Sequence, residues 1–369
     1  MAGAMRVLLI GLVLWAGIAK TLAVEIVKYS EFGGAYALGY PVPRPVSSLT
    51  PVDGFRSYES LHARHQSLML LNSRVHGSVV SRTTKGRPIW AYQLSDRNSR
   101  TITGFPEPAL LVTGTVHARE WSTAEVATAI IEHLADNARD RGVHQYLLEN
   151  TDIIVVPVVN VDGLILSQRF PSAAIVDKNP GVPRDGRLRR KNMQGVDGRL
   201  KTFEDHLLGT DLNRQWYPAW ASSTQSSSDP ESIVHHGIGP MSEPESQALL
   251  SAAALGPENR LRLYIDIHSY GRVFFVPKTF NERRNSLTQS LVYKLARQLG
   301  ALGAPHRVEF IDRNDYGGTT DEYHAETYGI PSFTLETEPG IDGGADYGGF
   351  GAPSDGFILP ESEIARVRD

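Results

Sequence analysis

Segments with helical spacing alternate with short apolar segments along the chain from residue 52 onwards. Short apolar runs predict buried strands, and stretches whose apolar positions recur every three to four residues predict helices. The predicted elements are, in chain order, a helix at Tyr58 to Leu71, strands at Ala109 to Val112 and Ile153 to Val159, a helix at Glu243 to Ala254, a strand at Leu261 to His268, a helix at Ser286 to Leu299 and a strand at Ile330 to Leu335. This alternation predicts an α/β fold, a single domain with a twisted, mixed and mainly parallel sheet and helices on both faces.

The start of the chain has a different pattern. Arg6 precedes an apolar run from Val7 to Ala19 that is followed by small residues, which predicts a cleaved export signal over residues 1–23. A membrane anchor is the alternative, but the run is short for a hydrocarbon core of about 30 Å, and Lys20 interrupts it. We therefore expect a secreted or periplasmic protein without stable membrane insertion.

The remainder of the chain divides into two parts. Residues 24–51 contain repeated glycine and proline with little periodicity, which predicts an extended N-terminal segment. Residues 52–369 form the one predicted folded domain. Within it, the stretch from Ser222 to Ser232 is rich in serine and has no large apolar residue to bury, so we expect a surface loop rather than a linker.

Charge and cysteine content narrow the possible partners. The formal net charge is -4 at pH 7, so nothing attracts the whole protein to nucleic acid. Basic residues gather between Lys178 and Lys201, but without interleaved aromatic residues they indicate a solvated loop. The chain has no cysteine, which excludes disulfides and thiolate zinc sites and leaves histidine and carboxylate as metal ligands. Export without cysteine favours a bacterial protein.

A candidate metal site follows the first buried strand. His117 and Glu120 lie in the predicted loop between that strand and a helix. Ser122 and Glu125, three residues apart, predict a capping box at the N-terminus of this helix. Open α/β sheets place ligands in such crevices at strand ends. Imidazole nitrogen and carboxylate oxygen are both zinc donors, and a short loop can bring them to one ion. The pair alone is a weak signal, so a third ligand is needed.

His268 is the best candidate for the third ligand. It ends the strand that begins at Leu261, which places it at the sheet edge where the first pair is expected. A lone histidine at a strand end is more often a hydrogen-bonded core residue. His235 and His236 are alternatives, but their surroundings, rich in serine and glycine, predict a loop. Three protein ligands leave one coordination position open, as in catalytic rather than structural zinc sites.

Several motifs, in order, resemble those of the carboxypeptidase A/B-type zinc metallocarboxypeptidases, from about Val52 to Ile364. Each motif alone is unspecific, but their joint occurrence is highly specific. The motifs are His-Ala-Arg-Glu at 117–120, Arg-Lys at 190–191, Asp-Leu-Asn-Arg at 211–214 followed by Trp216, His-Ser-Tyr at 268–270, and Phe-Thr-Leu-Glu at 333–336. The resemblance implies one zinc ion per chain, held by His117, Glu120 and His268.

The same resemblance implies two catalytic residues. Glu336 matches the general base of the family, and Glu338 is its rival because both would face the same side of an extended strand. Arg190 is similar to the arginine that stabilises the oxyanion, a role in which one well-placed donor is worth about 3 kcal/mol. Its neighbour Arg189 is the alternative if the match is off by one residue.

Substrate-binding residues are also implied. Asn213 and Arg214 are similar to the pair that binds the terminal carboxylate of a substrate, a task suited to the planar guanidinium group. Arg119 and Tyr270 are expected to line the cleft. The remaining assignments depart from the family pattern.

Tyr316, before a pair of glycines, is the candidate for the mobile tyrosine of the family, but the spacing is shorter here and Tyr323 is the alternative. Thr320 lies where the pocket-floor residue is expected, and because it is neither clearly apolar nor charged, the side-chain preference stays undecided. The final helix usual in the family after a segment like that at residues 355–360 is expected to be absent.

These inferences predict a zinc-dependent hydrolase whose catalytic domain at residues 52–369 removes the C-terminal residue of peptides. An amidohydrolase of the same fold, acting on cell-wall peptides or acyl-amino acids, is the nearest alternative. A catalytically silent zinc-binding or peptide-binding module is a further one, and it is disfavoured because Glu336 and Arg190 are both present.

Overall fold

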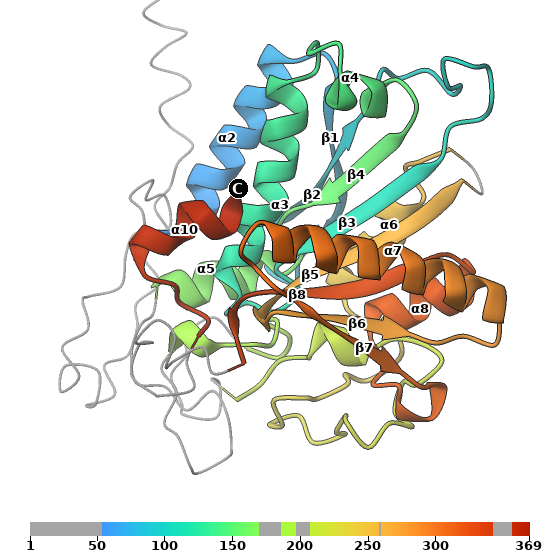
Figure 1. The fold of residues 1–369 in the computed structure, drawn as a ribbon. Helices are drawn as coiled ribbons and strands as arrows, with labels where there is room; N and C mark the ends of the chain where they lie inside the picture. The colour runs from blue at the N-terminus through green and yellow to red at the C-terminus, as the bar shows by residue number, and fades with distance from the viewer. Residues whose placement is uncertain (1–53, 170–185, 197–206, 258–259, 342–355) are drawn as a thin grey trace, which may run out of the picture.

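A computed structural model describes residues 54–169, 186–196, 207–257, 260–341 and 356–369 of the chain. The predicted signal and the extended N-terminal segment lie outside these residues. An eight-stranded sheet, in the order β1-β2-β4-β3-β5-β8-β6-β7, forms the centre of the described part (Figure 1). The strands are β1 Val75–Arg82, β2 Pro88–Leu94, β3 Ala109–Gly114, β4 Asp152–Val156, β5 Leu261–Gly271, β6 Val273–Pro277, β7 Arg307–Ile311 and β8 Ser332–Gly340.

Parallel pairing dominates the middle of the sheet. The neighbours β4, β3, β5 and β8 all run in one direction. Antiparallel pairs join β1 to β2, β2 to β4 and β6 to β8, whereas β6 and β7 are parallel. The prediction of a mixed, mainly parallel α/β sheet is therefore confirmed.

Helices cover both faces of this sheet. They are α2 Tyr58–Leu71, α3 Trp121–Asp136, α4 Val143–Leu148, α5 Val161–Arg169, α6 Pro244–Ala253, α7 Glu282–Ala301, α8 Thr320–Thr327 and α10 Glu361–Arg368. In Figure 1, α3 and α7 lie in front of the sheet and α6 and α8 behind it. Successive residues of β3 pack on opposite faces, since Val112 joins a core with α3 and Leu111 joins a core with α6.

The carboxyl ends of the central strands meet at one edge. His268 on β5 pairs directly with Glu336 on β8, and β3 ends at Gly114 opposite Ile267. The loop from β3 to α3 therefore emerges beside β5, and its residues come close to His268. The parallel register is what brings the predicted site residues together, because all three chain segments leave the sheet in the same direction.

Two local expectations were wrong. Glu120, not Ser122, is the N-cap of α3, and no side chain caps that helix. The carboxylate of Glu125 instead bonds to Arg56, with an Nε to Oε2 distance of 2.7 Å. The predicted capping box fails because a partly buried ion pair with Arg56 takes the glutamate that would have closed it.

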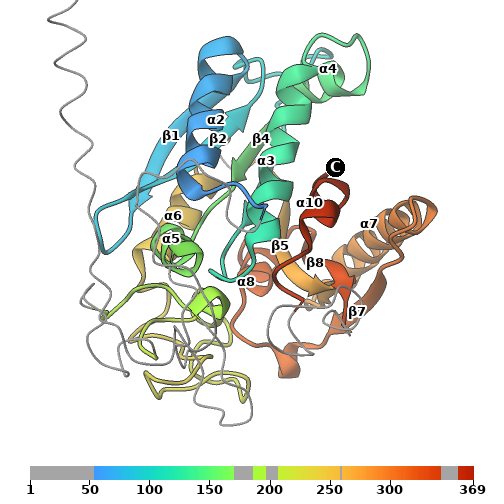
Figure 2. The same ribbon diagram turned by 90° about the vertical axis from the view of Figure 1, so that its left-hand side faces the viewer.

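The second correction concerns the end of the chain. The helix α10 follows Pro360 directly, where a final helix was expected to be absent. It packs beside α3 (Figure 2). The buried side chain of Ile364 and ion pairs from Arg366 to Glu338, at 2.8 Å, hold it in place. The helix is short, and its apolar spacing is correspondingly weak in the sequence.

Candidate active site

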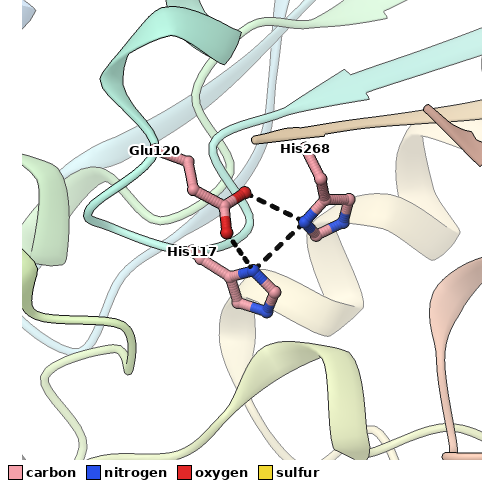
Figure 3. Close-up of side chains that lie close together, drawn as sticks. All are labelled: His117, Glu120 and His268. Carbon is pink, nitrogen blue, oxygen red and sulfur yellow. Dashed lines mark hydrogen bonds and ion pairs between the residues drawn. The ribbon is translucent and has the colours of Figure 1, made fainter. Parts of the chain in front are cut away.

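Three buried side chains converge at the carboxyl end of the sheet (Figure 3). The Nδ1 atom of His117 lies 2.7 Å from Oε1 of Glu120. The Nδ1 atom of His268 lies 3.0 Å from Oε2 of the same carboxylate and 3.1 Å from Nδ1 of His117. The predicted trio therefore presents two imidazole nitrogens and one carboxylate to a common point, which is a donor set suited to zinc.

Different elements position these ligands. His117 lies in the loop after β3, Glu120 occupies the N-cap position of α3 and His268 belongs to β5. The Thr123 hydroxyl, which donates to the Glu120 carbonyl at 2.7 Å, closes the first turn of α3. The amide N–H of Ser269 donates to Oε2 of Glu120 at 3.2 Å. These two hydrogen bonds hold the backbone and the carboxylate of Glu120 in place beside both histidines.

A second carboxylate orients His117. The Oδ1 atom of Asp211 lies 3.2 Å from Nε2 of His117, and its Oδ2 atom accepts a hydrogen bond from Nε of Arg190 at 2.8 Å. Although burial opposes the negative charge, Arg190 and His117 hold the pKa of Asp211 well below its usual range. An ionised Asp211 favours the proton on Nε2 of His117, so that the lone pair of Nδ1 faces the other ligands.

His268 is oriented in the same way by a carboxylate on its own strand. Its Nε2 atom lies 2.9 Å from Oδ2 of Asp266, which leaves Nδ1 directed at Glu120. Burial opposes the charged imidazolium, but Asp266 and Glu120 raise the pKa of His268 well above its usual value. The two Nδ1 atoms, 3.1 Å apart, can face each other only with a proton or a cation between them. The geometry therefore fits a zinc ion.

Glu336 lies beside this trio with one carboxylate oxygen unused. Its Oε2 atom is buried and makes no hydrogen bond. Burial, together with the nearby charge of Glu120, raises the pKa of Glu336 to about 8. Its rival Glu338 is engaged elsewhere, since Arg366 binds it at 2.8 and 2.9 Å. Arg272 binds the same carboxylate at 2.5 Å.

A cavity of about 250 Å³ opens in front of these residues. It is lined by two of the ligands, His117 and His268, together with predicted catalytic and substrate-binding residues, namely Arg190, Asn213, Arg214 and Glu336. Apolar side chains, Phe275, Pro277 and Ile311, line it as well. One cavity thus joins the metal site, the candidate base and three polar donors.

Asn213 and Arg214 occupy a short 3-10 helix, Leu212–Arg214, which is capped by the Asp211 carboxylate. The side-chain oxygen of Asn213 accepts a hydrogen bond from the amide N–H of Thr320 at 2.9 Å. This contact fixes the Oδ1 atom, so the amide NH₂ group of Asn213 is available to other acceptors. Arg214 donates from Nη1 to the Asn213 carbonyl at 2.6 Å and from Nε to the Gln225 carbonyl at 3.0 Å.

Arg119 and Tyr270 do not line this cavity, and each contacts the ring of Phe357. The guanidinium carbon of Arg119 lies 4.2 Å from the ring centroid of Phe357. The rings of Tyr270 and Phe357 meet edge to face, with centroids 4.8 Å apart. The segment before α10 therefore supplies an aromatic ring that joins the two predicted residues, a contact that no sequence motif indicated.

The remaining predicted residues point away from the cavity. The hydroxyl of buried Tyr316 donates to the carbonyl of Lys278 at 2.7 Å. The second candidate tyrosine, Tyr323, packs against Trp216 with ring centroids 5.1 Å apart. The hydroxyl of Thr320 faces Asp266 and Asn213 rather than the cavity. The neighbours of Thr320 in the chain, Thr319 and Asp321, line the cavity instead.

Arg189 and His235 lie apart from the trio. Arg189 is buried and donates from Nη2 to the carbonyl of Leu208 at 2.7 Å. His235 directs Nδ1 to the Ser227 carbonyl at 3.2 Å. Among the described residues, the ligand trio is the one group of histidines and carboxylates that converges closely enough to hold a metal.

No role was predicted for Asp211 or Asp266, although both contact a ligand. Asp211 stands in the Asp-Leu-Asn-Arg motif, and Asp266 stands two residues before His268 in an otherwise apolar strand. Since side chains two apart on a strand share a face, an acidic residue at this position could have indicated a partner for the histidine.

The α/β sheet and the His-Glu-His trio define a zinc-binding α/β protein. The sequence matches the model of the zinc carboxypeptidase family over residues 65–369, and the chain belongs to that family. Carboxypeptidase O of Bos taurus is 27% identical over 76% of this chain and 66% of its own length. A metallocarboxypeptidase A-like protein of Trichophyton verrucosum is 27% identical over 70% of this chain and 54% of its own. The chain thus spans less than two thirds of either relative.

Solved structures share the fold. Carboxypeptidase A of Helicoverpa armigera superposes with a TM-score of 0.66 at 23% identity, covering 90% of this chain and 75% of that one. Thrombin activatable fibrinolysis inhibitor superposes with a TM-score of 0.66 at 20% identity, covering 88% and 73%. At these identities the likeness concerns the fold alone. Within the described residues, no helix is both long and apolar enough to span a bilayer.

Proposed function

We propose that this protein is a metallocarboxypeptidase, which hydrolyses the C-terminal peptide bond of peptides. The observation that carries the proposal is the shared cavity, which is lined by the two histidine ligands, by Glu336 and by the Asn213-Arg214 pair. An endopeptidase has no need of fixed cationic and amide donors beside the metal. An exopeptidase does, because a free terminal carboxylate must be recognised.

A zinc ion held by the trio would supply a Lewis acid that polarises the scissile carbonyl and makes a water molecule more acidic. Glu336 is the proposed general base, which takes a proton from the attacking water and passes it to the leaving amine. Its Oε2 atom is buried without a hydrogen bond, and in the metal-free site burial and the Glu120 charge raise its pKa to about 8. The bonding of Glu338 to two arginines leaves it poorly placed for the same task.

Arg190 is the proposed donor to the developing oxyanion. Asp211 holds it on one side through the 2.8 Å bond to Nε, so its remaining N–H groups can point into the cavity that it lines. A preorganised donor of this kind is worth about 3 kcal/mol in the transition state. Arg214 and the NH₂ group of Asn213 are the proposed partners of the terminal carboxylate.

The remaining predicted substrate-binding residues are proposed to act less directly on the terminal residue of the substrate. Thr320 is proposed to act through Asn213, because its backbone N–H fixes the Asn213 amide. Arg119 and Tyr270 are proposed to hold residues of the substrate further from its C-terminus, with Phe357 as their common support. A substrate role for Tyr316 requires its hydroxyl to leave the Lys278 carbonyl.

The direct test is product analysis after incubation of the zinc-loaded protein with a peptide library that varies at the C-terminus. We expect single C-terminal amino acids to be released one after another, and a strong chelator to stop the release. Internal fragments as first products would refute the proposal. Release from cell-wall cross-links or acyl-amino acids, with none from ordinary peptides, would favour an amidohydrolase of the same fold.

We further propose a division of the chain into an export signal at residues 1–23, an extended segment at 24–51 and the catalytic domain at 52–369, in a secreted or periplasmic protein. The apolar run after Arg6 supports the signal. Mass spectrometry of the protein recovered from outside the cytoplasm tests this division. A recovered chain that still carries residues 1–23 would contradict it.

A further inference from the structure

A buried carboxylate on β5 contacts one metal ligand and no solvent. Asp266 is 0% exposed, lies two residues before His268 and shares its face of the strand. Its Oδ2 atom lies 2.9 Å from Nε2 of His268. We propose that Asp266 is a positioning residue, which holds the His268 ring for zinc and connects that ligand to the substrate-binding side of the cavity.

Neighbouring hydroxyl groups fix the Asp266 carboxylate in place. Thr113 lies directly opposite on β3 and donates its hydroxyl proton to Oδ1 of Asp266 at 2.7 Å. Because that proton is used, the Tyr264 hydroxyl, 2.8 Å from Oγ1 of Thr113, must donate to it. The two oxygens of Asp266 therefore accept from groups that cannot easily turn away.

The fixed carboxylate determines which nitrogen of His268 carries the proton. An ionised carboxylate can only accept, so Nε2 of His268 must carry the proton in this contact. The lone pair of Nδ1 is then free for a metal and is directed at the ligand point. The histidine is 1% exposed, so no solvent group can replace Asp266 if it is removed. Partners of this kind typically contribute about tenfold to hundredfold to metal affinity.

Asp266 also connects the metal side of the cavity with the substrate side. The Thr320 hydroxyl donates to the same Oδ2 atom of Asp266, and the Thr320 backbone N–H donates to Oδ1 of Asn213 at 2.9 Å. One continuous chain of buried hydrogen bonds thus runs from His268 through Asp266 and Thr320 to Asn213. Only this last connection rests on the proposed function, since it assumes that Asn213 binds substrate.

The test is the zinc affinity of Asp266→Asn, measured by competition with a chelator of known affinity. The asparagine amide keeps the shape of the carboxylate but has one acceptor oxygen, whereas Thr113, His268 and Thr320 all donate to Asp266. We therefore expect the zinc affinity to fall by about tenfold to hundredfold. The matched control is Asp152→Asn, a second buried aspartate, on β4 at the opposite end of the sheet. Unchanged affinity in Asp266→Asn, or an equal loss in both variants, would overturn the proposal.

A second measurement avoids dependence on folding of the variant. In zinc-loaded wild-type protein with labelled histidine, we expect nuclear magnetic resonance to show His268 protonated at Nε2, with the downfield proton typical of a carboxylate partner. A His268 that carries its proton on Nδ1 would overturn the proposal. Asp266→Asn should move this signal, and Asp152→Asn should not.

A separate variant tests the connection to Asn213. Thr320→Val removes the hydroxyl and keeps the backbone N–H. We expect its zinc affinity to fall less than that of Asp266→Asn, while KM for peptides with a free carboxylate rises. An unchanged KM would remove the connection to the substrate side and leave the metal role intact. This separates failure of the proposed function from failure of the Asp266 inference.

Discussion

Replacing Glu336 by glutamine should change the stability of the metal-free protein in a direction that depends on pH. Glu336 shares its buried surroundings with Glu120, and burial together with that neighbouring charge raises its pKa to about 8. The unfolded chain gives up the same proton near its ordinary value of 4.5. Between these two values the folded state binds the proton and the unfolded state does not.

The free energy of unfolding must therefore fall as pH rises through this window. The penalty is absent below about pH 4.5, where both states are protonated, and is nearly complete at pH 8. At about 1.4 kcal/mol for each pKa unit, it amounts to something on the order of 4 kcal/mol. Glutamine is neutral at every pH, so Glu336→Gln escapes the loss and gains stability over wild type as pH rises.

The assay is urea unfolding of both metal-free proteins at several pH values between 5 and 8. The matched control is Glu338→Gln, which removes a carboxylate already held by Arg272 and Arg366 and should destabilise instead. Zinc-loaded Glu336→Gln should keep its metal and lose turnover by about a hundredfold to ten-thousandfold. Parallel stability curves for wild type and Glu336→Gln would refute the burial of Glu336 against Glu120.

The remaining predictions concern metal content and acid stability. Elemental analysis should find one zinc per chain, and His268→Ala should lose it at low free metal; full occupancy in that variant would show that the ligand is misassigned. Burial lowers the pKa of His65 to about 3, and Thr128 is 2.9 Å from its Nε2 atom. As pH falls, the unfolded chain therefore binds a proton on this histidine before the folded state does. The contribution of neutral His65 to the free energy of unfolding is present above about pH 6.5 and is lost as pH falls. His65→Gln should flatten that part of the stability curve in urea titrations, and an unchanged slope would contradict it.

The elements with strong local signals were predicted from sequence. The bounds of α2 agree with the predicted stretch from Tyr58 to Leu71, and the structure adds a cap, since Ser57 accepts from the Ser60 N–H at 3.1 Å. The strands β1, β2, β6 and β7 were missed. In the edge strands β1 and β7, partial exposure weakens the apolar pattern, whereas β6 is largely buried. The pairs of β2 with β4 and of β6 with β8 join segments distant in sequence, which no local window contains.

The site also has features with local sequence signals and features that depend on residues distant in sequence. The loop that brings His117 to Glu120 is local, so its spacing indicated a candidate pair, which was a weak signal until His268 and the family motifs were added. The convergence of His268 with them depends on the parallel register of β3 and β5, for which only the strand-end position gave a hint. For Thr320, a motif position fixes where the backbone lies, but the neighbouring Asp266 decides where the hydroxyl points. Sequence position therefore predicted proximity better than orientation.

Recognition of a free C-terminal carboxylate by Asn213 and Arg214 beside the metal site is what would make this enzyme an exopeptidase. The decisive measurement compares kcat/KM for matched peptides with a free or an amidated C-terminus, in wild type and in Arg214→Ala. Leaving one member of a buried charge pair unpartnered costs about 2 to 5 kcal/mol, so wild type should prefer the free acid by about thirtyfold to several thousandfold. Arg214→Ala should lose most of that preference by losing activity on the acid alone. Equal cleavage of acid and amide by the wild type would contradict the proposed function.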